Sequence, residues 1–358
     1  MVHFVLALVV LLTVIGYKNK YVQCVGFLVL FGFAALRFLY GNDYLSYYMW
    51  FEHIHSGGYS PFKTELLYTL LNKYLPSFFV LVALSSALLI FLIYRLLTRN
   101  LPTEYVWIGM FIFLINPYLF LMNLSALRQS MATCFFIIAA NFAYNKKPLR
   151  YLFFVVIAAL IHKSAWVLVP MYFLINNKPV KAGTCWVILL TVLALLSLDV
   201  LGDVVIWVTG LFNDTNYDYL AGENAQNSVR ATLLTSVYFI YTLYNLPRLK
   251  GRTLAFGKLY LIGCLLGVLA REVAILTRVQ MYFDIFSIVV LPMIFLQVQS
   301  RGPVVVNQRN VLITFWDCVN KYLMPFLIVA IYLLRYQSFC TNPLWKTFFT
   351  YRTILLLL

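Results

Sequence analysis

The chain has 358 residues, of which 63% are hydrophobic and only 11% are charged. A soluble domain needs roughly a quarter charged residues to cover its surface, so this composition excludes a protein whose exterior faces water. The formal net charge of +15 would suggest a nucleic-acid partner in a soluble protein. Here we expect it to reflect orientation in a membrane, and we expect no nucleic-acid binding.

Apolar runs of roughly membrane-spanning length follow one another along the chain. They lie at about 2–16, 21–40, 77–97, 105–122, 130–144, 184–201, 231–247, 258–276, 281–297 and 320–335, with a further apolar stretch at 150–176. Because no long polar stretch interrupts them, we predict an all-α polytopic membrane protein. It would form a single integral membrane domain over residues 1–358, with about 10–12 transmembrane helices.

Residues 150–176 allow either one long crossing or a broken helical hairpin, because His162-Lys163-Ser164 divides two apolar halves. Cytoplasmic loops carry an excess of Lys and Arg, so charge can choose between the two. With an outside N-terminus and a hairpin whose tip faces outside, 16 of the 27 Lys and Arg residues but only 2 of the 12 acids lie inside. The sixteen are Lys18, Lys20, Arg95, Arg99, Lys146, Lys147, Arg150, Lys178, Lys181, Arg248, Lys250, Arg252, Lys258, Arg301, Arg309 and Lys321. A single crossing would reverse every later loop, so we predict the hairpin.

This alternation places two larger segments on the outer face. The first covers residues 41–76 and has a turn-rich centre, Gly57-Gly58-Tyr59-Ser60-Pro61, between aromatic flanks. The second covers about 202–230 and includes the short apolar run 204–212, which could only lie in or dip into the interface. Its charged residues are Asp203, Asp214, Asp218, Glu223 and Arg230. The tail 338–351 is also predicted outside.

Charged side chains near hydrocarbon cost several kcal/mol unless they are paired or hydrated, so each one is a candidate functional group. Arg128 and Gln129 open the helix predicted from residue 130, where a guanidinium and free backbone amides both suit a phosphate. The alternative for Arg128 is interfacial anchoring. Arg278 lies at an outer turn between two apolar runs, and Asp284 is its one evident local partner.

His162 lies at the tip of the predicted hairpin, which favours a functional role, although a lone histidine in a membrane protein is more often a packing residue. Asp43, Tyr47 and Glu65 belong to the first outer segment. Carboxylates among aromatic rings suit a glycan, whereas aromatic residues alone at a membrane surface form a belt. We predict no metal site, because the pair His53-x-His55 lacks further ligands at suitable spacing.

Motifs for soluble cofactors are absent from the sequence. It contains no glycine-rich phosphate loop, no GxSxG, no HExxH and no DxD pair for a nucleotide–metal complex. We therefore predict no cofactor, and we expect any glycosyl donor to be carried by a lipid.

Several short elements occur in an order that is similar to a known family. They are Gly41-Asn42-Asp43 with Tyr47, Glu65-Leu66-Leu67-Tyr68, Leu127-Arg128-Gln129, Lys146-Lys147, His162-Lys163-Ser164-Ala165 with Pro170, and Arg278 with Tyr282-Phe283 and Leu291-Pro292. The chain thereby resembles the EpsG-type bacterial polysaccharide polymerases, which are relatives of the Wzy O-antigen polymerases. The arginine–glutamine pair and the histidine element are the most specific parts of this resemblance, which covers most of the chain.

The resemblance implies a multi-pass protein of the bacterial inner (cytoplasmic) membrane with its active site facing the outside or periplasm. Such a polymerase joins oligosaccharide repeat units carried on polyprenyl pyrophosphate into O-antigen, capsule or exopolysaccharide, by a glycosyl transfer that is thought to need no metal. Membrane lipid and the lipid-linked oligosaccharide are the implied partners, with a chain-length regulator and a flippase as further candidates.

Glycosyl transfer from a lipid pyrophosphate needs cations for the leaving group and a base for the acceptor hydroxyl. We expect Arg128 and Arg278, with Arg230 as a weaker third, to hold the pyrophosphate. Asp43, Glu65 or His162 would accept the proton; we favour one of the carboxylates, with His162 contacting a phosphate or hydroxyl. The remaining substrate-binding candidates are Gln129, Tyr47 and Tyr282.

Two other functions agree with the same residues. A polyprenyl-phosphate-sugar glycosyltransferase or a glycan ligase would use the same outer-face arginines but would add one sugar or transfer finished polymer. A non-enzymatic flippase or transporter would instead place charges through the midplane and show related halves. The candidates here gather at one face, and the sequence has no internal repeat.

Overall fold

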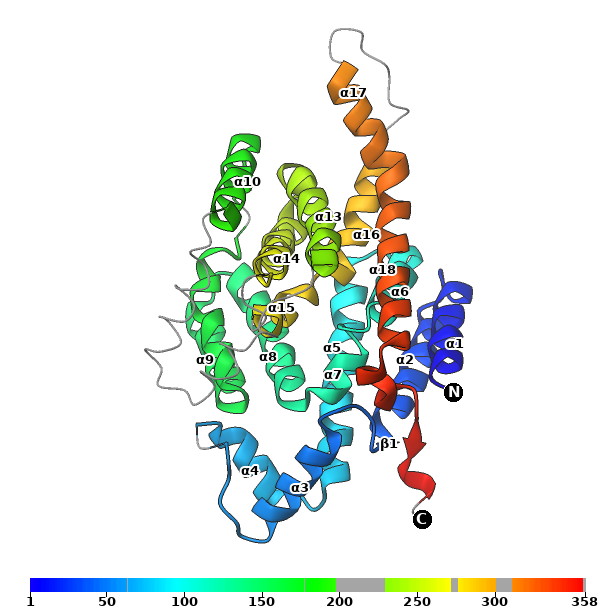
Figure 1. Ribbon diagram of the computed structural model, residues 1–358, viewed down its shortest axis with the longest axis vertical. Coiled ribbons are helices and arrows are strands. Elements are labelled where there is room, and N and C mark those ends of the chain that lie inside the picture. The colour runs from blue at the N-terminus through cyan, green and yellow to red at the C-terminus, as the bar shows by residue number, and fades with distance from the viewer. Residues whose placement is uncertain (63, 177, 198–228, 272–275, 301–310, 357–358) are drawn as a thin grey trace. The chain divides into compact units, whose positions relative to one another are not determined.

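The computed structural model describes residues 1–62, 64–176, 178–197, 229–271, 276–300 and 311–356 (Figure 1). Within these ranges the chain is almost entirely helical, and its one sheet has two strands of two residues each. The predicted all-α class is therefore confirmed. The chain forms two compact units: unit 1 is Met1–Phe173 with Tyr332–Leu358, and unit 2 is Leu174–Ile331. That the whole chain acts as one membrane domain stays a prediction.

Unit 1 is built from helices that pack in sequential pairs, α1 on α2, α2 on α5, α5 on α8 and α8 on α9. Its elements are α1 (Val2–Ile15), α2 (Lys20–Ala35), β1 (Arg37–Phe38), α3 (Tyr44–His55), α4 (Leu66–Tyr74), α5 (Phe78–Asn100), η1 (Thr103–Tyr105), α6 (Val106–Ile115), α7 (Leu121–Ser125), α8 (Leu127–Tyr144), α9 (Pro148–Ile161), η2 (Lys163–Phe173), the end of α18 (Met324–Thr341), η6 (Pro343–Phe348), β2 (Arg352–Thr353) and η7 (Ile354–Leu356). Local signals start several helices; for example, the Ser77 hydroxyl accepts a hydrogen bond from the Val80 amide at the N-terminus of α5.

Unit 2 is organised around α14, which packs against α13, α15 and α16. Its elements are α10 (Ala182–Ser197), α13 (Val229–Asn245), η4 (Leu246–Arg248), α14 (Gly251–Leu269), α15 (Leu276–Asp284), α16 (Ser287–Gln299), α17 (Val311–Cys318), the π-helical η5 (Val319–Leu323) and the beginning of α18. The side-chain amides of Asn245 and Asn320 bond reciprocally at 2.9 and 3.1 Å, and Arg248 Nη2 lies 3.2 Å from Asp317 Oδ1. Arg248 and Asp317, both predicted on the cytoplasmic side, are thus neighbours.

Three described helices are long and apolar enough to cross a membrane: α5, α14 and the continuous stretch Phe315–Thr341. A fourth would be the pair α15 and α16, which is bent by 55°. The sequence predicted one continuous run there, but the chain bends where Phe283 and Asp284 press against Gly263 of α14. Shorter apolar helices of 10–17 residues include α1, α2 and α9. The polytopic class is confirmed, and the number of ten to twelve spans stays a prediction.

The stretch 150–176 contains the predicted hairpin. Helix α9 ends at Ile161, and His162 has extended backbone angles, φ −148° and ψ 112°. The 3-10 helix η2 then returns along α9, since the Tyr151 hydroxyl donates to the carbonyl of Leu168 and the rings of Tyr151 and Tyr172 are 5.4 Å apart. The returning half is a 3-10 helix of 11 residues rather than an α-helix, and it contains Pro170.

The first outer segment, 41–76, contains two helices, α3 and α4, on either side of its predicted turn. Gly57 in this turn has a φ of +93°, a conformation that favours glycine. The buried positions of α3, Tyr44, Phe51 and Ile54, recur at helical spacing and explain why this flank is helical. The second outer segment falls mostly on residues 198–228, so its apolar run 204–212 and its acidic residues lie outside the described residues.

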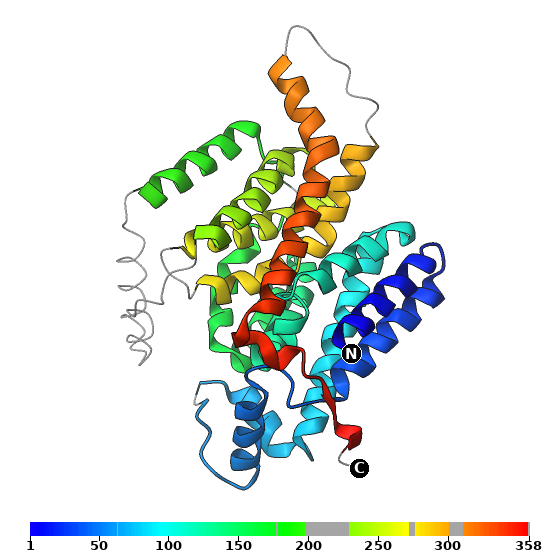
Figure 2. The same cartoon turned by 45° about the vertical axis from the view of Figure 1, so that its right-hand side comes forward.

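The C-terminal residues of unit 1 return to the end of α2. Strands β1 and β2 pair antiparallel, with Arg37 opposite Thr353. The Tyr351 ring stacks on Phe33 at 4.5 Å. Figure 2 shows this red segment beside the blue helix α2. Eight other apolar runs lie between residues 77 and 335. If each of them crosses the membrane once, the C-terminal ends of α2 and α18 lie on the same side of the membrane only when residues 150–176 enter and leave on the same side. On that condition, the pairing agrees with the predicted hairpin.

Candidate functional site

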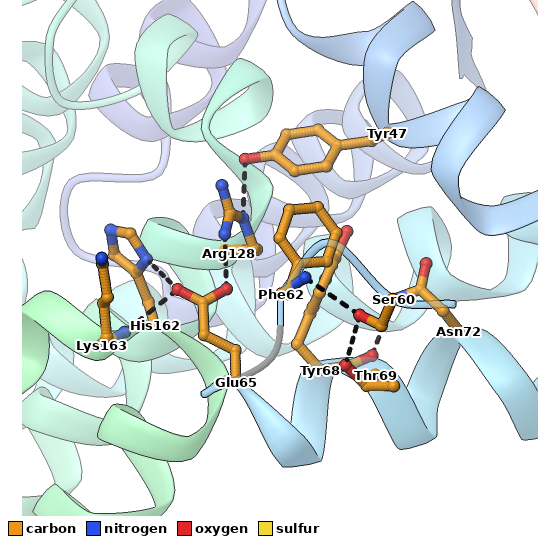
Figure 3. A network of polar contacts seen from close by, with 10 residues as sticks. All are labelled: Tyr47, Ser60, Phe62, Glu65, Tyr68, Thr69, Asn72, Arg128, His162 and Lys163. Atoms are coloured by element: carbon orange, nitrogen blue, oxygen red, sulfur yellow. Dashed lines mark hydrogen bonds and ion pairs between the residues drawn. The ribbon is translucent and has the colours of Figure 1, made fainter. Parts of the chain in front are cut away.

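Three segments that are far apart in the sequence meet at the carboxylate of Glu65 (Figure 3). Arg128 Nη1, at the beginning of α8, donates to Glu65 Oε2 at 2.5 Å. His162 Nδ1, at the hairpin tip, lies 2.9 Å from Glu65 Oε1, and the Lys163 backbone amide donates to the same oxygen at 3.1 Å. Three of the residues predicted from the sequence thus converge within unit 1.

Glu65 occupies the N-cap position of α4, but its side chain makes no capping hydrogen bond. The carboxylate instead reaches Arg128 and the hairpin tip, and its side chain is only 3% exposed. A buried carboxylate is stable only when donors compensate for lost hydration, and here three donors do so. Glu65 therefore acts as the common anchor of α4, α8 and the hairpin.

The surroundings of Glu65 fix its protonation state. Burial alone would raise its pKa, but the hydrogen bond from His162 and the charge of Arg128 together lower the pKa below its ordinary value of 4.5. At neutral pH Glu65 is therefore an ionised acceptor, and His162 Nδ1 carries the proton that it shares with Glu65. Because a general base works best with a pKa near the working pH, Glu65 is poorly suited to accept a proton.

Arg128 lies in an aromatic cage. Its guanidinium carbon is 4.2 Å from the ring centroid of Phe62, 5.6 Å from that of Tyr47 and 5.9 Å from that of Tyr68. Its Nε donates to the Tyr47 hydroxyl at 3.4 Å. These contacts orient the plane of the guanidinium, since cations favour the faces of aromatic rings.

Part of the Arg128 guanidinium is available to a ligand. In the described part of the chain Nη2 has no hydrogen-bond partner, and the side chain is 23% exposed. Arg128 is in the first turn of α8, which has no side-chain cap. Donors from a guanidinium and from a helix N-terminus together suit a phosphate.

Asp43 lies close enough to Tyr47 for its charge to act on the Tyr47 hydroxyl. It is exposed at the N-cap position of α3, and the Ser125 hydroxyl donates to its Oδ2 at 3.3 Å. Burial is the main reason that the pKa of Tyr47 is raised, and the charges of Asp43 and Glu65 raise it further while Arg128 opposes them. Tyr47 therefore interacts with Asp43 as well as with the Arg128–Glu65 pair. That Asp43 belongs to the same site stays a prediction.

The approach of Asp43 to Ser125 depends on Gly41. Gly41 has a φ of +87°, and a Cβ atom added there would lie 2.8 Å from the Cβ atom of Ser125. No other residue type allows this conformation and this contact without strain. The start of the Gly41-Asn42-Asp43 element is thus required by backbone geometry.

The other predicted residues lie apart from this centre. Gln129 is next to Arg128 but is buried, with 5% exposure, which does not favour direct contact with a substrate. Arg230 and Arg278 are exposed on α13 and α15, and Tyr282 of α15 is fully buried. These last three belong to unit 2, whereas the centre described above is built from unit 1 alone. Their convergence on Arg128 stays a prediction.

Sequence reasoning missed two kinds of residue. Phe62 forms the closest wall of the Arg128 cage, and no local pattern marked it. Arg37 is 2% exposed and donates to Ser86 Oγ at 2.6 Å and to the Leu124 carbonyl at 3.0 Å, so it ties the end of α2 to α5 and α7. Its signal was a single charged residue inside the apolar run 21–40.

The histidine pair of α3 serves packing in this structure. The His53 ring contacts Trp50 with 6.0 Å between centroids, and the His55 ring stacks on Phe51 at 5.4 Å. Neither histidine reaches the Glu65 carboxylate by a hydrogen bond in the described residues. The absence of a metal site stays a prediction.

Comparison with known proteins identifies one family. The EpsG family model matches residues 20–352, a range that contains Asp43, Glu65, Arg128 and His162. No curated protein and no solved structure matches the chain. The match agrees with the resemblance found from the short motifs, and it supports a polysaccharide polymerase type of function in a membrane. The chain belongs to the EpsG family.

Proposed function

We propose that this protein joins oligosaccharide repeat units carried on polyprenyl pyrophosphate, by glycosyl transfer at the outer face of the bacterial inner membrane. The observation that carries the proposal is the Arg128–Glu65–His162 network, which holds an oriented and partly free guanidinium. Tyr47 bonds to this guanidinium and also interacts with the charge of Asp43. Family membership supports the general class of reaction.

The reaction needs donors for the leaving pyrophosphate. The acceptor hydroxyl oxygen bonds to the anomeric carbon of the donor sugar while the bond from that carbon to the pyrophosphate oxygen breaks, and the electron pair leaves with the phosphate. Arg128 Nη2 and the first amides of α8 supply donors for this developing charge. Glu65 and Phe62 hold the guanidinium in place, so little reorganisation is needed during the reaction. We propose that no metal ion takes part in this step.

Asp43 is the best candidate to accept the proton of the acceptor hydroxyl. Its carboxylate is exposed and receives one hydrogen bond, from Ser125, whereas Glu65 receives three and is held ionised by a cation. Proton transfer to a positioned base typically contributes about 10²- to 10⁴-fold in rate. We therefore propose Glu65 as the anchor and Asp43 as the base.

His162 would contact the substrate through its second ring nitrogen. Nδ1 is committed to Glu65, and in the described residues Nε2 has no partner, with the side chain 17% exposed. A neutral ring with its proton on Nδ1 presents an acceptor at Nε2, which suits a sugar hydroxyl, and a protonated ring presents a donor, which suits a phosphate. Both match a lipid-linked glycan.

The outer location is supported by the parts of unit 1 that lie together. The hairpin tip contacts Glu65, and the C-terminal residues contact the segment that leads to Asp43. Charge asymmetry places all of these segments outside. The partners would be the lipid-linked oligosaccharide and membrane lipid, with a flippase supplying the substrate and a chain-length regulator acting on the product.

The test is deletion of the gene in its native host, followed by complementation. Deletion should cause single lipid-linked repeat units to accumulate where long polymer was made, and the natural chain should restore the polymer. Arg128→Ala should fail to restore it, with a loss of activity on the order of 10²- to 10³-fold. Arg128→Lys should restore little, because an ammonium cannot reproduce the oriented fork.

Arg150→Ala is the matched control, because Arg150 is exposed at the beginning of α9 and its guanidinium lies over the Phe142 ring without a hydrogen bond or ion pair to the described residues. It should restore polymer fully. If deletion leaves polymer length unchanged, or if the lipid-linked product grows by single sugars rather than by whole repeat units, the polymerase proposal is wrong. The second result would instead identify a glycosyltransferase.

A further inference from the structure

The C-terminal residues hold the residue that immediately precedes Asp43. The side-chain amide of Asn42 donates to the carbonyl oxygen of Leu344 at 3.1 Å, and the Thr347 hydroxyl donates to Asn42 Oδ1 at 2.5 Å. Both polar ends of Asn42 are therefore bound by η6, which lies more than 300 residues later in the chain.

The same C-terminal residues fix the other end of this short segment. The Ile354 amide donates to the carbonyl of Leu36 at 3.0 Å, beside the β1–β2 pair. Between these points the buried ring of Tyr40 packs edge-on against Phe348 and Tyr351, each with 5.7 Å between ring centroids. Residues 36–42 are thus held along their whole length by residues 344–354, which we call the C-terminal clamp.

The backbone between the C-terminal clamp and Asp43 has little conformational freedom. Gly41 is already confined against Ser125, so the orientation of Asn42 sets the direction in which the chain enters α3 at Asp43. The only side-chain hydrogen bond of Asp43 in the described residues comes from Ser125. A base must be held within a few tenths of an ångström of its reacting geometry, and a displacement of about 1 Å can cost on the order of 100-fold in rate.

We propose that the C-terminal clamp is a positioning element of the site, in which Thr347 acts through Asn42 to hold the Asp43 carboxylate in its reacting position. This inference rests on the proposed function, because it takes Asp43 as the base. Thr347 and Asn42 touch no substrate in this scheme and are positioning residues. Both side chains are exposed, so the hydrogen bond between them contributes little to the free energy of folding. Its main effect is on the position of the loop that carries Asp43.

The experiment uses the full chain in lipid nanodiscs, with the lipid-linked oligosaccharide extracted from cells that lack this protein. Thr347→Val removes the hydroxyl at nearly constant volume and should lower kcat about 10- to 100-fold, with KM changed less than about twofold. Thr347→Ser keeps the hydroxyl and should restore kcat to within about threefold of the natural value. Thr341→Val is the control, because among the described residues that exposed hydroxyl bonds to carbonyls of its own helix alone, and its kcat should not change.

Asn42→Ala and the double variant complete the test. If both residues act through one contact, the double variant should lose no more activity than the worse single variant. An unchanged kcat in Thr347→Val, a Ser variant no better than the Val variant, or additive losses would each overturn the clamp. An Asp43→Asn variant that keeps its natural kcat would instead overturn the assignment of the base, so the two failures are distinguishable.

Discussion

Glu65 and His162 are 97 residues apart in the chain, yet the Glu65 Oε1 and His162 Nδ1 atoms lie 2.9 Å apart. This bond attaches the tip of the hairpin to the N-terminus of α4. A second bond, from the Lys163 amide to the same oxygen, fixes the backbone at the break between α9 and η2. One carboxylate therefore satisfies the polar groups at a break that lipid could not cover.

Loss of the Glu65 carboxylate should destabilise unit 1. In Glu65→Gln the amide keeps the shape of the side chain but loses the charge that holds Arg128, so we expect the free energy of unfolding to fall by about 1–3 kcal/mol. Thermal unfolding in detergent micelles measures this as a lower midpoint. Glu52→Gln is the matched control on the exposed side of α3, and its midpoint should match that of the natural protein. Equal midpoints for all three proteins would contradict the anchoring role.

The stability contributed by Glu65 should depend on pH in a defined direction. Its pKa in the folded protein is lowered from about 4.5, so the contribution is fully present above that pH and is lost as the pH falls through the folded pKa. The difference in unfolding midpoint between the natural protein and Glu65→Gln should therefore stay constant from about pH 8 to pH 5.5 and shrink in more acidic solution. A difference that grows on acidification would show the opposite shift of pKa.

Substitutions of the two carboxylates should differ in their effects on activity and on stability. Asp43→Asn should lower kcat by about 10²- to 10⁴-fold while the protein keeps its unfolding midpoint, because it removes an exposed basic group but keeps an oxygen that can accept from Ser125. Glu65→Gln should lower the midpoint as well as the activity. Measured turnover of the lipid-linked oligosaccharide separates the cases. If His162→Gln lowers kcat by about 10²- to 10⁴-fold and Asp43→Asn does not, then the histidine is the proton acceptor.

The hairpin predicts the side of the membrane from which each loop can be labelled by a soluble reagent. The six natural cysteines are all buried or half-buried, and a cysteine-free variant gives a clean background. Lys163→Cys should react with a membrane-impermeant maleimide added outside intact cells or spheroplasts. Asn145→Cys and Lys178→Cys, on either side of the hairpin, should react only after the membrane is opened. Labelling of Lys178→Cys from outside would show that residues 150–176 cross the membrane once.

Much of the architecture could be predicted because the bilayer imposes simple rules. Apolar length marked most helices, and the distribution of Lys and Arg selected the hairpin at His162. Three site residues were found for the same reason, since charged groups next to apolar runs are conspicuous. The bend between α15 and α16 escaped prediction because it depends on close packing against Gly263 of α14, and no local sequence signal carries that contact.

The finer chemistry of the site was beyond sequence reasoning. Glu65 and Asp43 were equal candidates as base, because the sequence does not show how many hydrogen-bond donors surround each carboxylate. The contact between Phe62 and Arg128 depends on how the turn before α4 folds across the beginning of α8. Arg278 was marked by its charge at an outer turn, but it belongs to unit 2 whereas Arg128 belongs to unit 1, and their convergence stays a prediction.

The pairing of β1 with β2 also imposes an order of events on biosynthesis. A ribosome releases residues 36–42 early, but their partners at 344–354 are among the last to be made. The loop that carries Asp43 must therefore wait, unpaired, until every later segment has entered the membrane. A chain that stops before residue 344 lacks the proposed clamp, so on that proposal unfinished polypeptides would process substrate poorly while they are still attached to the translation machinery.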